Sequence, residues 1–206
     1  MGRQRERPQP GVTMAFMERA AQDRVRIAQT AARYIAEHGV ADWSLAKRKA
    51  VRELGLPARE ALPGDEEIEA ALLEYHTLFG GVAHAARLRE QRTHALRWMH
   101  NLKAFAPELV GGVAAGWATA HSDIRLDLVA PDAKDVEFAL LNANIAYRTM
   151  HGDRDGAAEL YIDTPVAGVR LSIRSAAAAR QRQQRDRNGQ EPVRLDAAAL
   201  MALLAD

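Results

Sequence analysis

The stretch VGGVAAGWATAHSDIRLDLVA, residues 110–130, decides the fold of the second half of the chain. Its first part consists mainly of glycine and alanine, and the pair Gly111-Gly112 predicts a tight turn. In its second part, apolar residues stand at every second position from Ile124 to Leu128, with the charged Arg125 and Asp127 between them. Side chains of a strand point alternately to its two faces, so this pattern predicts a strand that is buried on one face.

Elements of both kinds are predicted beyond this strand. Residues 133–144 have the spacing of a helix, and Asp132 is placed to cap it. The segments 146–150, 158–164 and 168–175 are typical of strands, with turn-forming residues between them. A short apolar helix follows over 195–205. This order of elements predicts a small mixed sheet accompanied by helices.

The first half of the chain is predicted to be helical. Apolar residues recur at three- and four-residue spacing over 13–38, 44–55, 66–80 and 84–105. We expect Ser44 and Asp65 to cap the second and third of these helices. The predicted fold class is therefore α+β, with a helical N-terminal region packed on a small mixed-sheet domain. The expected divisions are a disordered basic tail (1–12), a helical region (13–105), an α/β domain (106–175) and a polar linker with a C-terminal helix (176–206).

Composition limits the classes of function. The chain has 206 residues, and its formal net charge of +1 gives no general attraction to nucleic acids or membranes. It contains no cysteine, which excludes disulfides, thiolate zinc sites and cysteine nucleophiles. No apolar run approaches the roughly 18 residues of a membrane-spanning helix. The basic start lacks the apolar core of a secretory signal. We therefore expect a cytoplasmic protein without a membrane partner.

The turn and the strand after it resemble the nucleotidyltransferase (DNA polymerase β-like) superfamily. In that superfamily a strand ends in a Gly-Ser turn, and the following strand carries an Asp-x-Asp or Asp-x-Glu pair. Here Gly111-Gly112 stands at the turn, and HSDI (121–124) enters the strand. The resemblance covers residues 95–175. The N-terminal helices are also similar to those of a family of small bacterial nucleotidyltransferase-like proteins.

The resemblance implies a site for metal-dependent nucleotidyl transfer. Such transfer uses two divalent ions about 4 Å apart, which activate the attacking oxygen and neutralise the leaving pyrophosphate. Asp123 would be the catalytic carboxylate that binds the metal, and Asp163, or Glu159 in its place, would be the further carboxylate. Mg²⁺ is the expected cofactor only if the protein is active. The implied nucleotide- and phosphate-binding residues are Gly111, Gly112, His121, Ser122 and Arg125, although His121 is also placed to cap the loop.

Two positions depart from the superfamily pattern. Arg125 stands where the second carboxylate belongs, and Gly112 replaces the usual serine. Asp127 lies on the same face of the strand as Asp123, but at roughly 13 Å, which is too far to share one pair of ions. A guanidinium between these aspartates would form ion pairs that compete with metal binding. The leading hypothesis is therefore a protein that binds a nucleotide or a nucleic-acid end, and its status as an enzyme stays open.

Two alternative functions are left open by the sequence. The first is a non-catalytic regulatory or interaction module, whose helical half binds a protein partner or a second copy of the chain. The second is a helix-turn-helix regulator, because residues 24–57 have a rhythm similar to that of tetracycline-repressor-type DNA-binding regulators. Three acids at 65–67 have the wrong sign for contacts with DNA phosphates. A steep salt dependence of DNA affinity would identify the second alternative.

Overall fold

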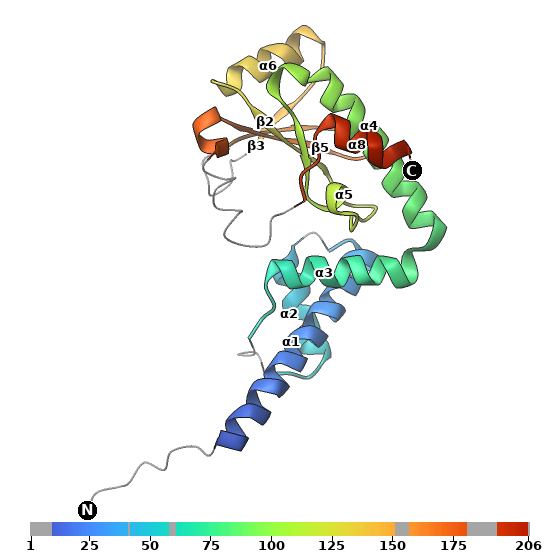
Figure 1. Ribbon diagram of the computed structural model, residues 1–206, viewed down its shortest axis with the longest axis vertical. Coiled ribbons are helices and arrows are strands. Elements are labelled where there is room, and N and C mark those ends of the chain that lie inside the picture. Colours follow the sequence, from blue (N-terminus) through green and yellow to red (C-terminus); the bar gives the residue numbers. More distant parts are fainter. Residues whose placement is uncertain (1–9, 41, 58–60, 151–156, 181–192, 206) are drawn as a thin grey trace, which may run out of the picture. The chain divides into compact units, whose positions relative to one another are not determined.

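The computed structural model describes residues 10–40, 42–57, 61–150, 157–180 and 193–205 (Figure 1). The chain forms two compact units, one in residues 1–79 and one in residues 80–206. The predicted α+β class is confirmed, because the first unit is helical and the second contains a five-stranded mixed sheet. In the part of the chain that is described, no helix has both the length and the apolar character needed to cross a membrane.

The boundary between the units differs from the predicted one. We predict a division after residue 105, but the chain divides after Phe79. The reason is that the fourth helix packs against the sheet, so it belongs to the second unit. Of the predicted tail 1–12, residues 1–9 lie outside the described residues, and the first helix begins at Pro10. Most of the predicted polar linker, residues 181–192, lies outside them as well.

The first unit consists of three packed helices, α1 (Pro10–His38), α2 (Trp43–Glu53) and α3 (Asp65–Tyr75), followed by the π-helical turn η1 (His76–Gly80). Helix α1 contacts both of the others. Small side chains on α1 and α2 allow the backbones to approach closely. The fully buried residues of this core are Ile27, Ala31, Ala32, Ala46, Ala50, Ile68 and Leu72.

The helix caps of this unit differ from the prediction by one or two residues. Asp42 caps α2, because its side chain accepts a hydrogen bond of 3.1 Å from the Leu45 N–H. The predicted cap Ser44 is therefore wrong and lies inside the helix. Helix α3 is preceded by Gly64, whose N–H donates to Glu67 at 2.8 Å, and Asp65 is already its first residue. In both cases an acid near the helix start satisfies a backbone N–H that the helix leaves unpaired.

The second unit contains the elements α4 (Gly81–Asn101), η2 (Lys103–Phe105), β1 (Glu108–Val110), α5 (Gly112–Ala115), β2 (Ile124–Val129), α6 (Ala133–Asn142), β3 (Arg148–Met150), β4 (Ala158–Ile162), β5 (Val169–Arg174) and α8 (Ala197–Ala205). The predicted strands are confirmed, and so is Asp132 as the cap of α6, where it accepts from the Lys134 N–H at 3.0 Å. The sheet order is β1-β2-β5-β4-β3. Only β2 and β5 are parallel, and the other neighbours are antiparallel.

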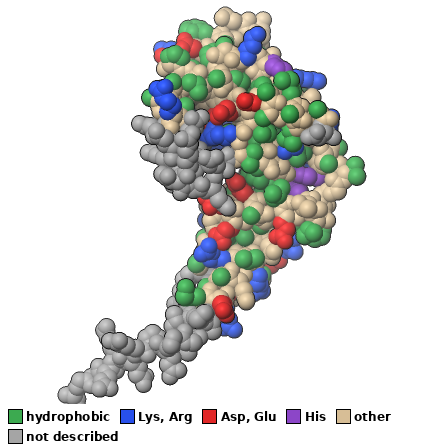
Figure 2. Space-filling view, viewed as in Figure 1, with side chains coloured by type: hydrophobic (Ala, Val, Ile, Leu, Met, Phe, Trp, Pro, Cys, Tyr) green, Lys and Arg blue, Asp and Glu red, His purple; other side chains and the backbone are tan. Residues whose placement is uncertain are grey.

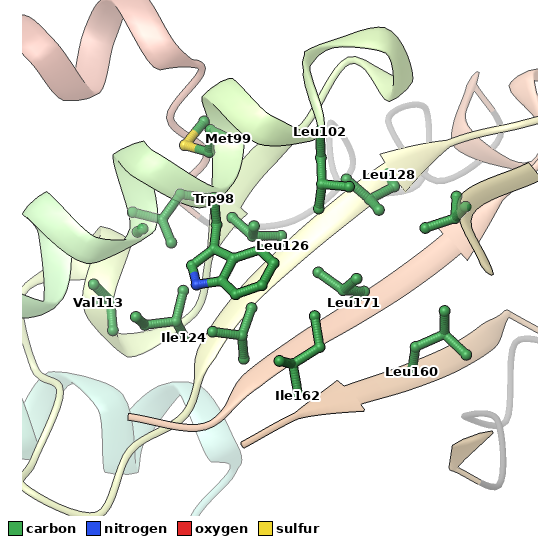
Figure 3. Packing of buried hydrophobic residues seen from close by; sticks show 14 of the residues in the cluster. Trp98, Met99, Leu102, Val113, Ile124, Leu126, Leu128, Leu160, Ile162 and Leu171 are labelled. Carbon is green, nitrogen blue, oxygen red and sulfur yellow. The ribbon is translucent and has the colours of Figure 1, made fainter. Parts of the chain in front are cut away.

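One face of the sheet is apolar and carries the core of this unit (Figure 3). Alternate residues of β2, β4 and β5 point to this face, as their period of two requires. Helices α4, α5, α6 and α8 each contribute buried side chains to the same cluster. In Figure 3, the Trp98 ring of α4 lies against the aliphatic residues of the strands. The opposite face carries charged side chains on the neighbouring strands β2, β5 and β4, and the candidate site lies there.

His94 of α4 gives the second unit a pH-dependent contribution to stability. The Trp98 indole N–H donates to His94 Nε2 at 3.1 Å, which requires that nitrogen to be unprotonated. Burial, together with the charge of Arg97, lowers the pKa of His94, and Glu90 opposes the shift. A lowered folded-state pKa means that this stability is present above the unfolded-state pKa and is lost as the pH falls through the folded-state pKa.

We therefore expect the free energy of unfolding to fall as the pH decreases from about 7.5 to about 5. His94→Gln should weaken this dependence, because glutamine does not titrate. His100→Gln, at an exposed position of the same helix, is the matched control and should leave the dependence unchanged. Denaturant unfolding at a series of pH values measures the effect. Equal pH profiles for the wild type and His94→Gln would contradict the assignment.

Candidate functional site

The turn after β1 is shaped by two glycines. Gly111 has φ +71°, in the left-handed region that favours glycine. At Gly112, an added Cβ would lie 2.7 Å from two ring atoms of Trp117, so the indole packs directly on the glycine backbone. A serine at position 112, which the superfamily pattern has, would collide with this ring. The departure from that pattern thus has a local structural cause.

The loop between α5 and β2 is fixed by its own hydrogen bonds. Thr119 donates its N–H to the Ser122 hydroxyl at 2.9 Å, and the His121 N–H donates to the Thr119 hydroxyl at 3.1 Å. The buried Gln91 side chain of α4 donates to the Thr119 carbonyl at 3.2 Å. The His121 side chain itself is exposed. Ser122 therefore shapes the loop, and the loop presents Asp123 at the start of β2.

Asp123 belongs to a cluster that Arg170 of β5 holds together. The Arg170 guanidinium donates to Asp123 at 3.2 Å and to Glu159 of β4 at 3.4 Å. Glu159 is 5% exposed, and it also accepts from the Ser172 hydroxyl at 3.4 Å. The Tyr161 hydroxyl donates to the other oxygen of Asp123 at 3.4 Å. Asp123 and Glu159 come from different strands, and one guanidinium bridges them.

The pKa shifts in this cluster agree with its contacts. Burial tends to lower the pKa of Arg170, but the hydrogen bond and charge of Asp123, followed by those of Glu159, outweigh burial and raise it. Burial and the charges of Asp123 and Asp163 raise the pKa of Tyr161. The tyrosine hydroxyl therefore keeps its proton and remains a donor to Asp123.

Gly168, which precedes β5, allows these side chains to meet. An added Cβ at this position would overlap the Tyr161 hydroxyl and lie 2.5 Å from the Asp123 carboxylate. The backbone carbonyl of Gly168 accepts from the Ile124 N–H at 2.8 Å, which ties it to the start of β2. The Tyr161 and Asp123 side chains thus meet directly above Gly168, which has no side chain.

A second arginine occupies the other end of β2. Arg194 donates to Asp127 at 2.9 Å and to Glu108 of β1 at 3.0 Å. Burial tends to lower the pKa of Arg194, but Asp127 and then Glu108 outweigh it, so the pKa is raised. The neighbouring Leu195 pairs with Leu109 through two backbone hydrogen bonds, which brings Arg194 to this edge of the sheet. Each end of β2 therefore has one arginine shared by two carboxylates.

The predicted role of Arg125 in these ion pairs is wrong. Asp123 pairs with Arg170 and Asp127 pairs with Arg194, and no ion pair of Arg125 is found among the described residues. The side chain of Arg125 is exposed. It lies next to the turn, since a Cβ added at Gly111 would be 3.3 Å from the Arg125 Cδ. Arg125 thus leaves its charge accessible to solvent.

Of the two further carboxylates that the sequence suggests, the structure connects Glu159 to Asp123 through Arg170. Asp163 instead pairs with Arg148 of β3 at 2.9 Å, with both side chains mostly exposed. Arg148 also lies over the Tyr161 ring, 5.0 Å from its centre. The site therefore contains Asp123, Glu159 and Arg170, while Asp163 belongs to an outer ion pair.

The residues of the site do not fit a divalent metal ion. Two carboxylates that converge on Mg²⁺ would need the space between them, and the Arg170 guanidinium lies there. Nowhere in the described part of the chain do three or more His, Asp or Glu residues form a group that could hold a metal. The space between Asp123 and Glu159 thus holds a cationic group of the chain itself.

Sequence reasoning missed Arg170, Arg194, Tyr161 and Gly168. A sequence signal for Arg170 was available. Apolar and polar residues alternate in VRLSIR (169–174), which places its two arginines and its serine on one face of a strand. Its importance depends on the register of Arg170 beside Arg125 and Tyr161, which the sequence alone does not determine. No known family model matches the chain, and comparison with curated proteins finds no match. The nucleotidyltransferase resemblance therefore depends on the sequence motifs alone.

Proposed function

We propose that the chain is a nucleotidyltransferase-like protein that binds a nucleotide, or the phosphorylated end of a nucleic acid, without metal-dependent transfer. The observation that carries the proposal is the Arg170 guanidinium between Asp123 and Glu159. An arginine in that place stays charged and keeps both carboxylates ion-paired, since its side chain does not lose its proton in proteins. Two-metal chemistry needs those carboxylates free to bind ions.

Arg125 is the proposed contact for the phosphate group. It is exposed and lies beside the turn at Gly111, and its charge is not engaged by the neighbouring aspartates. A planar guanidinium can donate two parallel hydrogen bonds to one phosphate group. The chain has no cysteine, which agrees with a reducing compartment, and we propose the cytoplasm as its location.

An interaction module is the second candidate, and a groove in the first unit favours it. The groove has a volume of about 340 Å³ and lies between α1 and the segment formed by α3 and η1. Leu78 and Phe79 of η1 line it, and they are 66% and 71% exposed. Large apolar side chains that remain exposed are typical of protein-binding surfaces. Loss of self-association or partner binding in Phe79→Ser would support this candidate.

The geometry gives the DNA-binding alternative little support. Lys47 of α2 is buried and pairs with Asp65 at 2.7 Å. Arg24 of α1 pairs with Glu67 of α3 at 3.0 Å. These two basic residues are therefore ion-paired with acidic residues of the same unit. On the face that Figure 2 shows, acidic and basic side chains are interspersed. A DNA-binding surface instead concentrates basic side chains toward the phosphates.

Thermal unfolding with ATP, GTP, CTP and UTP, each with and without Mg²⁺, tests the main proposal. One nucleotide should stabilise the protein equally with and without the metal, by about 2.7 kcal/mol at 100 times its Kd. Arg125→Ala should remove this stabilisation. Arg87→Ala, which removes an exposed arginine from α4, should leave it unchanged. Stabilisation that requires Mg²⁺, or none with any nucleotide or with a 5′-phosphorylated oligonucleotide, would contradict the proposal.

A further inference from the structure

A cavity of about 200 Å³ lies at the far end of the polar sheet face from Asp123. Its lining includes apolar and charged groups in about equal number. They are Ala106, Glu108, Asp127, Leu128, Val129, Arg174, Ala179 and Arg194. The cavity is separate from the proposed nucleotide contact, because neither Arg125 nor the Gly111-Gly112 turn lines it.

Arg174, the last residue of β5, is the unusual member of this lining. It is 8% exposed, and its Nε is buried without a hydrogen-bond partner. Its side chain forms no ion pair or hydrogen bond with any residue that the structure describes. Both carboxylates of the cavity, Glu108 and Asp127, are instead bound by Arg194. A buried guanidinium keeps its charge, so leaving its donors unsatisfied costs free energy.

We propose that this cavity binds a small monocarboxylate, whose carboxylate group pairs with Arg174. A carboxylate offers two acceptor oxygens that match the forked donors of a guanidinium. Among the charged groups of the described lining, Glu108 and Asp127 pair with Arg194, so Arg174 offers one positive charge to a ligand. A single negative charge is therefore favoured over the double charge of phosphate. Val129 and the two alanines suit a short aliphatic chain beside the carboxylate.

Titration of the full chain with sodium propionate tests the proposal, with sodium chloride added to keep the ionic strength constant. Propionate should bind saturably and raise the unfolding temperature, whereas phosphate and sulfate should bind at least tenfold more weakly. Arg174→Met should weaken propionate binding at least tenfold, and Arg174→Lys should weaken it less, because lysine keeps the charge but loses the paired donors. Arg180→Met, at an exposed arginine nearby in sequence, is the matched control and should bind propionate normally.

The ligand-free variants provide an independent measurement. Arg174→Met should unfold at the same temperature as the wild type or at a higher one, because it removes a buried charge without a protein partner. A clear fall in that temperature would mean that protein groups satisfy Arg174, and would overturn the proposal. Unchanged propionate binding in Arg174→Met, or tighter binding of phosphate than of propionate, would overturn it as well. Since these tests contain no nucleotide, their failure is distinct from failure of the proposed function.

Discussion

Replacing Arg170 by leucine should lower the free energy of unfolding of the sheet unit by about 3 kcal/mol. The change leaves Glu159, which is 5% exposed, with the Ser172 hydroxyl as its remaining hydrogen-bond partner among the described residues. Removing one partner of a fully buried ion pair costs about 3–5 kcal/mol. The lower end applies here, because the side chains of Arg170 and Asp123 are 30% and 27% exposed.

Denaturant unfolding measures this loss, and two variants make the result specific. Arg148→Leu removes an arginine from the mostly exposed pair with Asp163 and should cost at most about 1 kcal/mol. Adding Glu159→Leu to Arg170→Leu should recover part of the loss, because the uncompensated buried charge is then gone. If Arg170→Leu cost no more than Arg148→Leu, the guanidinium would not hold the carboxylates together.

Gly168→Ala should destabilise the same unit by about 2–3 kcal/mol, the cost of inserting a methyl group into a filled site. The new Cβ would overlap the Tyr161 hydroxyl and crowd the Asp123 carboxylate, so one of these side chains must move. Because Tyr161 donates to Asp123, its displacement also disturbs the cluster.

Removal of the Tyr161 hydroxyl provides the control for this prediction. In Gly168→Ala combined with Tyr161→Phe, the nearest overlap disappears, and part of the lost stability should return. Thermal or denaturant unfolding of the two single variants and the double variant measures the coupling. Additive losses in the double variant, or a Gly168→Ala protein as stable as the wild type, would show that the close approach has no energetic consequence.

The fold could be predicted from the sequence where one local pattern decides it. Strand β2 follows from its strict alternation, and the cap of α6 follows from Asp132 alone. The helix caps at Asp42 and Gly64 were missed because several polar residues compete at those positions, and backbone geometry selects among them. The unit boundary was missed because α4 has the pattern of any amphipathic helix, and only tertiary packing assigns it to the sheet.

The candidate site could be predicted only in part, for a similar reason. The sequence indicates Asp123 and the turn at Gly111-Gly112, which are close in the chain. The partner of Asp123 is 47 residues away, and that of Asp127 is 67 residues away. Sheet order and register determine such pairs, and local spacing carries no information about them. Arg125 was assigned to the aspartates because it is their neighbour in sequence, and more distant arginines take that place.

We propose that Arg170 occupies the place where a nucleotidyltransferase would hold a metal ion. Calorimetric titration with Mn²⁺ tests it most directly, using the wild type, Asp123→Asn and Arg170→Gln. We predict no saturable Mn²⁺ binding by the wild type and a newly formed site in Arg170→Gln, where Asp123 and Glu159 become free to converge on the ion. Saturable binding by the wild type that Asp123→Asn abolishes would contradict the claim and restore metal-dependent transfer as the leading function.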